Sequence, residues 1–163
     1  GVLRILGVLL VMFSTTLLPP VLIALIGDDG GLQPFLIAYI TTLLVGGALW
    51  LPLRHHRHEL RVRDGFLIVV LFWTVLALFG ALPLLLSAEL QIGMTDALFE
   101  SMSGLTTTGA TVLTGLDTLP PSILYYRQQL QWLGGMGIIV LAVAVLPMLG
   151  VGGMQLYLSL IHI

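Results

Sequence analysis

Four long apolar runs alternate with short polar stretches along the chain. Each run holds about 20 residues or more, the length of helix that crosses the ~30 Å hydrocarbon layer of a bilayer. We therefore predict four membrane-spanning helices. They cover residues 2–26, 34–53, 66–86 and 122–149.

A shorter amphipathic segment, residues 95–105, lies between the third and fourth runs. As a helix it measures about 16 Å, roughly half the thickness of a bilayer. Asp96 lies in its first turn, where the positive end of the helix dipole favours a carboxylate, and Thr95 is placed to cap the same end. We predict a re-entrant helix that stops half-way through the membrane.

The hexapeptide Thr-Thr-Thr-Gly-Ala-Thr at residues 106–111 follows this half-length helix. An irregular loop at membrane depth is tolerated only where it is buried in protein or lines a watery cavity. Potassium filters are such loops, and their backbone carbonyls replace the water shell of the ion. Gly109 can take a positive φ at little steric cost. The pattern favours a cation-binding loop over the alternative, an ordinary turn.

Glu100 is an ionisable residue inside the predicted half-length helix, a position that usually indicates function. One hypothesis makes it a direct ligand of the ion. The other makes it a carboxylate that hydrogen-bonds the loop from behind. We favour the second, because a ring of charges binds an ion too tightly for rapid exit, and Arg127 is a candidate partner for the carboxylate.

Composition agrees with a membrane protein. The chain has 163 residues, of which 58% are hydrophobic and 9% charged, and its mean hydropathy is +1.09. Its net charge of -2 offers no case for nucleic-acid binding. It has no cysteine, which excludes disulfides and thiolate metal sites.

The loop between the second and third runs is the longest polar stretch, and it carries four of the six arginines. Arginine-rich short loops lie on the cytoplasmic side, so this loop is expected inside and the Asp28-Asp29 turn outside. An alternative is an intramembrane metalloenzyme built on histidines and a glutamate of this loop. The spacing does not match the zinc-protease motif His-Glu-x-x-His. The residues of this cluster are His55, His56, His58 and Glu59.

Prolines and glycines within the runs predict local irregularities. Pro19 and Pro20 are expected to kink the first helix, with hydroxyls of residues 14–16 bonding the carbonyls that the prolines leave free. The pair at 46–47 gives a small face for close helix packing. The Gly-Gly-Met-Gly sequence at 134–137 is either a hinge or a place where the re-entrant helix packs.

Several motifs together resemble one known family. They are Thr-Asp-Ala-Leu-Phe-Glu-Ser at 95–101, Leu-Thr-Thr-Thr-Gly-Ala-Thr at 105–111 and Gly-Leu-Asp at 115–117, with further likeness at 63–70, 126–128 and 131–138. This arrangement resembles the TrkH/TrkG family, membrane subunits of bacterial potassium uptake in the Trk/Ktr/HKT superfamily. The likeness runs from about residue 4 to residue 157.

The resemblance implies an all-α membrane protein with two leading transmembrane helices and then helix/re-entrant pore helix/helix repeats, four in the whole family protein. Residues 1–63 correspond to the leading pair and a cytoplasmic loop, and residues 64–157 to the first repeat. Within that repeat the filter is 106–111, and residues 158–163 receive no role. Carried over by resemblance, Thr111 lies at the outer mouth, and potassium is bound by the backbone carbonyls of Thr107, Thr108, Gly109 and Ala110.

The function implied by the resemblance is potassium uptake across the bacterial inner membrane, with potassium as the transported ion and no enzymatic activity. The family works as a dimer with a cytoplasmic nucleotide-binding regulator, TrkA. Three further pore repeats are expected beyond this stretch, which is interpreted as an N-terminal fragment. One strand cannot encircle an ion, so this piece alone is expected not to conduct.

A homotetrameric potassium channel subunit is the main alternative, and the leading helix pair argues against it. The filter also differs from the Thr-Val-Gly-Tyr-Gly loop of tetrameric channels. Ala110 stands where the aromatic residue would be, and Thr111 replaces the second glycine. We expect weaker discrimination against sodium than in those channels. Whether uptake is symport with a second ion is left open.

Overall fold

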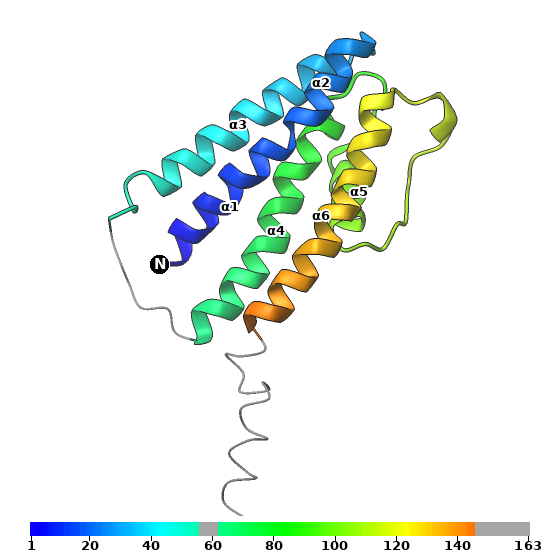
Figure 1. Cartoon of the computed structure of the whole chain (residues 1–163). Helices are drawn as coiled ribbons and strands as arrows, with labels where there is room; N and C mark the ends of the chain where they lie inside the picture. Colours follow the sequence, from blue (N-terminus) through cyan, green and yellow to red (C-terminus); the bar gives the residue numbers. More distant parts are fainter. Residues whose placement is uncertain (56–61, 146–163) are drawn as a thin grey trace, which may run out of the picture.

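A computed structural model describes residues 1–55 and 62–145 of the chain. Across these residues the protein is all-helical and contains no strand, as predicted (Figure 1). Helix α5 has half the length of its neighbours and lies against α4 and α6. The elements are α1 (Val2–Thr16), α2 (Leu18–Gly27), α3 (Leu32–Trp50), α4 (Val62–Leu86), α5 (Met94–Leu105), the 3-10 turn η1 (Leu116–Thr118) and α6 (Pro121–Val145).

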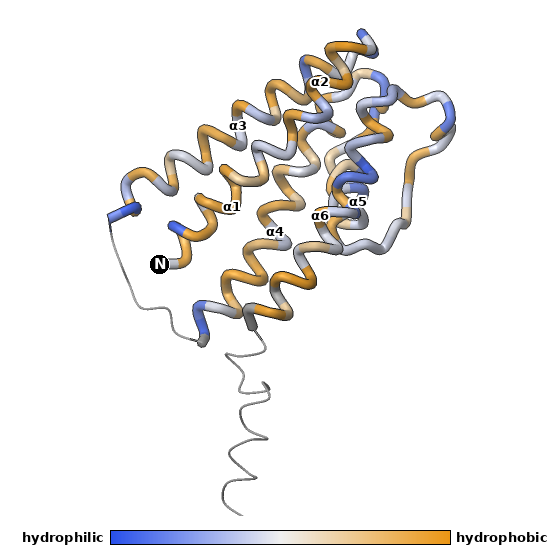
Figure 2. The backbone as a smooth tube through the Cα atoms, in the orientation of Figure 1, coloured by the Kyte–Doolittle hydropathy of each residue, from blue (hydrophilic) through white to orange (hydrophobic). Residues whose placement is uncertain are grey.

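Three helical stretches of the described part are long and apolar enough to cross a membrane. They are Val2–Gly27, Leu32–Trp50 and Arg63–Leu86. Helix α6 has 25 residues, as many as α4, but its first half carries Arg127 and several glutamines. Figure 2 shows polar residues at the two ends of the helix bundle and within α5 and α6, with apolar residues between. The predicted end of the fourth run, at residue 149, lies outside the described residues.

The backbones of α1 and α3 approach closely at two glycines. A β-carbon added at Gly46 would lie 2.9 Å from Cβ of Leu10, and one added at Gly7 would lie 2.8 Å from the amide nitrogen of Trp50. The expected small face is therefore confirmed at Gly46. Gly47 has open space around it and takes no part in this contact.

The first span is broken into α1 and α2, as its prolines predict. Pro20 has no N–H, so the carbonyl of Thr16 lacks its helical donor. The side chain of Gln129 in α6 supplies one, from Nε2 at 2.7 Å. The predicted role of the hydroxyls at 14–16 was wrong, because a helical Ser or Thr reaches back three or four residues. These hydroxyls bond carbonyls at 11–13 instead.

The turn between α2 and α3 holds the first turn of α6. Asp29 accepts the backbone N–H of Ser122 on Oδ2 at 2.9 Å and the N–H of Gly31 on Oδ1 at 3.0 Å. Partial burial raises the pKa of Asp29, but these hydrogen bonds outweigh it and the pKa lies below its usual value of 3.8. The carboxylate thus acts as an N-cap supplied from 93 residues away.

We expect Asp29→Ala to lower stability by about 1 kcal/mol, the usual value of an N-cap. The pKa of Asp29 is depressed in the folded protein, so its contribution is present above pH 3.8 and declines as the pH falls through the folded pKa. The measurement is the thermal unfolding midpoint of the complete protein in detergent at several pH values. Asp29→Asn, which keeps one acceptor oxygen but does not titrate, is the control.

Equal stability of wild type and Asp29→Ala near neutral pH would contradict the cap.

Candidate functional site

Helix α5 is anchored against α4 and α6. The Ser101 hydroxyl donates to the carbonyl of Ala77 in α4 at 2.8 Å, and a β-carbon on Gly104 would lie 2.9 Å from Cβ of Leu130 in α6. These small residues allow α5 to pack tightly between its two neighbours. The helix carries Asp96 in its first turn, also as predicted.

The predicted cap of this helix was wrong. Helix α5 begins at Met94 and its N-cap is Gly93, with no capping side chain. Gly93 has an extended backbone, with φ -76° and ψ 170°, the conformation that an N-cap takes. Thr95 lies inside the first turn, too late in the chain to cap it.

The end of α5 packs directly on the middle of α6 at Gly134. A β-carbon there would overlap the carbonyl oxygen of Leu105 and lie 2.6 Å from its carbonyl carbon. Since α6 runs as one helix from Pro121 to Val145, the structure favours packing over a hinge at this position. Gly135 and Gly137 are less crowded, with their nearest neighbours at 3.9 and 3.4 Å.

The chain leaves the helix after Leu105, and its N–H groups turn back towards α5. Thr107 donates to the carbonyl of Gly104 at 2.9 Å. Thr108 and Gly109 both donate to the carbonyl of Ser103, at 2.9 and 3.4 Å. The bonds from Thr107 and Thr108 form the Schellman motif that ends α5, with Thr107 at its left-handed position.

Two residues of this stretch have positive φ: Thr107 at 57° and Gly109 at 73°. Glycine takes such a conformation freely, as predicted for Gly109. For a β-branched threonine it is strained, and strain of this kind concentrates at ligand-binding sites. The backbone between α5 and η1 is therefore held in a specific, non-helical shape.

The carbonyls of residues 106–108 point away from α5. All described peptide bonds are trans, so each C=O is directed opposite to the N–H of the next residue. Those N–H groups are the three that bond α5. In the described part of the chain, no hydrogen bond ends on the carbonyl oxygen of any residue from 106 to 109. All four residues are exposed, so these oxygens form an open, electron-rich face.

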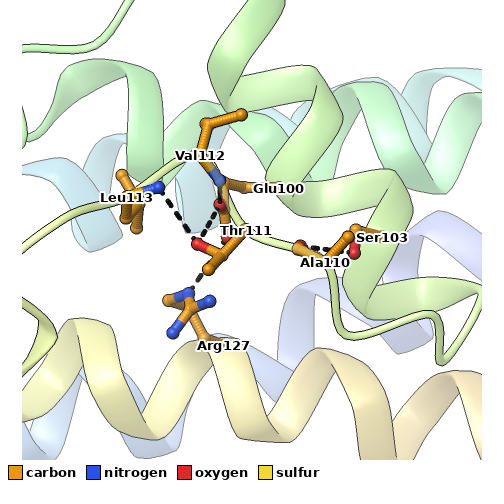
Figure 3. A network of polar contacts seen from close by, with 7 residues as sticks. All are labelled: Glu100, Ser103, Ala110, Thr111, Val112, Leu113 and Arg127. Atoms are coloured by element: carbon orange, nitrogen blue, oxygen red, sulfur yellow. Dashed lines mark hydrogen bonds and ion pairs between the residues drawn. The ribbon is translucent and has the colours of Figure 1, made fainter.

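Ala110 differs from its neighbours. Its carbonyl oxygen accepts the Ser103 hydroxyl at 2.6 Å, so it turns back towards α5 (Figure 3). Of the four predicted ion ligands, Thr107, Thr108 and Gly109 have carbonyls that receive no donor from residues 1–55 or 62–145, whereas the carbonyl of Ala110 accepts one hydroxyl. No such role was assigned to Ser103 from the sequence. A serine in the last turn of a helix that ends at a loop is the signal for this role.

Glu100 supports the same strand from behind, as we had favoured. Its Oε1 accepts the Thr111 hydroxyl and, at 2.7 Å, the backbone N–H of Val112. Its Oε2 accepts Nε of Arg127 at 3.1 Å, which forms an ion pair with α6. Figure 3 shows the carboxylate between the strand and Arg127. Leu113 extends the network by donating its N–H to the Thr111 hydroxyl oxygen at 3.0 Å.

The arginine-rich loop offers no comparable site in the part of the chain that is described. His55 is exposed, and its Nε2 accepts Nε of Arg54 at 3.0 Å. His56, His58 and Glu59 lie outside the described residues. Within 1–55 and 62–145, no group of three or more His, Asp or Glu side chains is placed to hold a metal.

Gly134→Ala is expected to displace the end of α5 and destabilise the complete protein by about 1–3 kcal/mol, the usual cost of overpacking. Gly135→Ala is the matched control, because its added methyl meets only ordinary contacts. It is expected to be neutral or slightly stabilising, because alanine favours helix over glycine. The measurement is the thermal midpoint of each variant in detergent. Equal midpoints for the two would contradict the contact.

Comparison with known proteins identifies relatives of the whole described arrangement. The family model TrkH, a cation transport protein, matches residues 31–162. The Trk system potassium uptake protein TrkH of Halomonas elongata is 65% identical over 96% of this chain. The protein TrkG of Escherichia coli strain K12 is 46% identical over 94%.

A solved structure agrees with these matches. The crystal structure of the potassium transporter TrkH from Vibrio parahaemolyticus superposes on 93% of the chain with a TM-score of 0.87 and 59% identity. The chain spans 32% of the length of that transporter and of the two relatives named above. The similarity therefore concerns one third of those proteins, and it includes both the leading helices and the loop behind α5. The chain belongs to the TrkH family of cation transport proteins.

Proposed function

We propose that this chain contributes one strand of a potassium-selective filter to a Trk-type potassium-uptake subunit. The observation that carries the proposal is that the carbonyls at 106–109 accept no hydrogen bond from the described part of the chain, and that those of 106–108 point away from α5. In a bilayer such oxygens need a partner, and a dehydrated monovalent cation is one. The relatives named for potassium uptake support potassium as that cation.

The ion is held by the carbonyl oxygens of Thr107, Thr108 and Gly109, with Ala110 as a weaker ligand. The oxygen of Ala110 already accepts the Ser103 hydroxyl and has one lone pair left. Thr111 lies at the outer mouth. The C-terminal end of α5 points at the same loop, and its partial negative charge adds to the attraction for a cation.

Three further strands complete the ring in the whole protein. In this chain, residues 1–63 form the leading helix pair with its loop, and residues 64–157 form the first pore repeat. The exposure of residues 106–112 supports the assignment, because a strand that faces partners in a ring is bare when considered alone. The relatives, about three times as long as this stretch, favour a single chain with several strands over a homotetramer.

The whole protein resides in the bacterial inner membrane, with the arginine-rich loop in the cytoplasm and the Asp28-Asp29 turn outside. It acts as a homodimer under the control of the nucleotide-binding regulator TrkA. Four arginines in one short loop support this orientation. The relatives are named as uptake proteins, which supports transport over the metalloenzyme alternative.

We expect Gly109→Ser in the complete protein to reduce the preference for potassium over sodium by about tenfold, since the left-handed conformation costs a non-glycine residue about 1–2 kcal/mol. Gly109 has φ 73°, and its β-carbon would meet no close neighbour, so the effect is conformational. The measurement is uptake of potassium or rubidium, with and without sodium, in cells that lack their own potassium uptake.

Gly47→Ser is the control, because Gly47 lies in α3 with ordinary φ and open space around it. It is expected to behave as wild type. An unchanged ion preference in Gly109→Ser would count against the proposed filter.

A further inference from the structure

The ion pair behind the filter is nearly inaccessible to solvent. The side chain of Glu100 is 2% exposed and that of Arg127 is 11% exposed. A carboxylate in such a place is stable only when its lone pairs are satisfied and its charge is balanced. Glu100 receives three donors: a hydroxyl, a backbone N–H and a guanidinium.

These three donors come from two separate parts of the chain. Thr111 and Val112 belong to the outer half of the filter strand, and Arg127 belongs to α6, nearly two turns after its start at Pro121. Glu100 itself lies in the middle of α5. The carboxylate therefore joins pore helix, filter and α6 at one point.

The inner half of the strand is held differently. The carbonyl of Ser103 accepts the N–H groups of Thr108 and Gly109. The hydroxyl of Ser103 donates to the carbonyl of Ala110. All of these are contacts within one short stretch of chain. Among the hydrogen bonds of the described residues, those of the outer half alone reach a charged group and, through it, a second helix.

On this basis we propose that Glu100 and Arg127 are positioning residues for ion selectivity, and that they act through Thr111 and Val112. The inference rests on the proposed filter. Arg127 balances the charge of Glu100 and orients its carboxylate, which then fixes the strand against movement towards the ion. Sodium is smaller than potassium, and carbonyls free to close in would bind it better. A strand pinned from behind resists that collapse.

A purely structural role for the pair makes a different prediction. It would lower the amount of folded protein when the pair is broken, yet leave the ion preference of the remaining protein unchanged. The two roles are therefore separated by measuring the ratio of potassium to sodium affinity alongside protein yield.

Thr111→Val is the sharpest variant. It removes the hydroxyl that donates to Glu100 and keeps the shape of the side chain. Thr111→Ser restores a hydroxyl and is the conservative rescue. We expect Thr111→Val to lose about tenfold in potassium preference, the value of one charge-assisted hydrogen bond, and Thr111→Ser to recover most of it.

Glu100→Gln and Arg127→Met test the pair itself. In Glu100→Gln the amide oxygen can still accept the N–H of Val112, but the amide NH2 group faces the guanidinium of Arg127. In Arg127→Met the buried carboxylate of Glu100 loses its cationic partner. Both are expected to lose preference, and the double variant is expected to lose no more than the worse single variant, because the residues act as one unit. Ser101→Ala is the matched control, since its hydroxyl bonds Ala77 in α4 and not the filter.

The assay is rubidium uptake by the complete protein in liposomes, with sodium as competitor. The proposal is overturned if folded Thr111→Val is as selective as wild type, or if the selectivity of Ser101→Ala falls as far as that of Glu100→Gln. If wild type itself shows no preference for potassium, the proposed function fails first. If wild type prefers potassium and the variants keep the same preference, the proposed function stands and only the role of Glu100 and Arg127 in selectivity is overturned.

Discussion

A peptide group in the hydrocarbon layer must find a partner for both its N–H and its C=O. Most of this chain meets that demand with helices. The stretch after α5 meets it on one side only, by directing the N–H groups of residues 107–109 to the last carbonyls of α5. Because these peptides are trans, the opposite carbonyls are presented together on the exposed side. The short length of α5, its close contact with α6 and the ion pair behind it all serve to hold this one arrangement.

Helix α6 explains how the leading helices contribute. In its N-terminal half, the backbone N–H of Ser122 donates to Asp29, and Arg127 pairs with Glu100. The side chain of Gln129 donates to the carbonyl of Thr16 at the proline break. These polar residues make the first half of α6 less apolar than the membrane-spanning helices, and Arg127 and Nε2 of Gln129 each have a partner inside the protein. The proline break in the first span thus creates an acceptor that α6 uses, so the kink and the filter support are parts of one packing arrangement.

Much of the architecture was predictable, because membrane helices follow from the length of an apolar run and a half-length helix followed by a Thr-Gly loop is distinctive. The support of the loop by Glu100 was also predictable, since a buried carboxylate needs donors. The rest depends on geometry that the order of residues does not contain. Gln129 reaches Thr16 across 113 residues, and Asp29 caps a helix 93 residues away.

Adjacent residues of one type also differed in ways that no periodicity indicates. Gly46 is pressed against α1 while Gly47 is free, and Gly134 contacts Leu105 while Gly135 does not. Likewise, Thr95 was the better capping residue by type, but the backbone placed Gly93 at the cap. For the glycines the decisive quantity is the direction in which the backbone faces a neighbour distant in the chain, and for the cap it is the local backbone conformation at Gly93.

The outward oxygens at 106–108 belong to the main chain, which has a consequence for inheritance. No codon change can delete a peptide carbonyl, so every missense allele of this segment retains the same oxygens. Mutation can instead alter the backbone conformation that directs these oxygens. It does so by changing the φ angle allowed at residue 109 or the groups of α5 that hydrogen-bond the strand. Selection on this part of the gene therefore acts on shape, while the chemical groups themselves are common to every possible descendant.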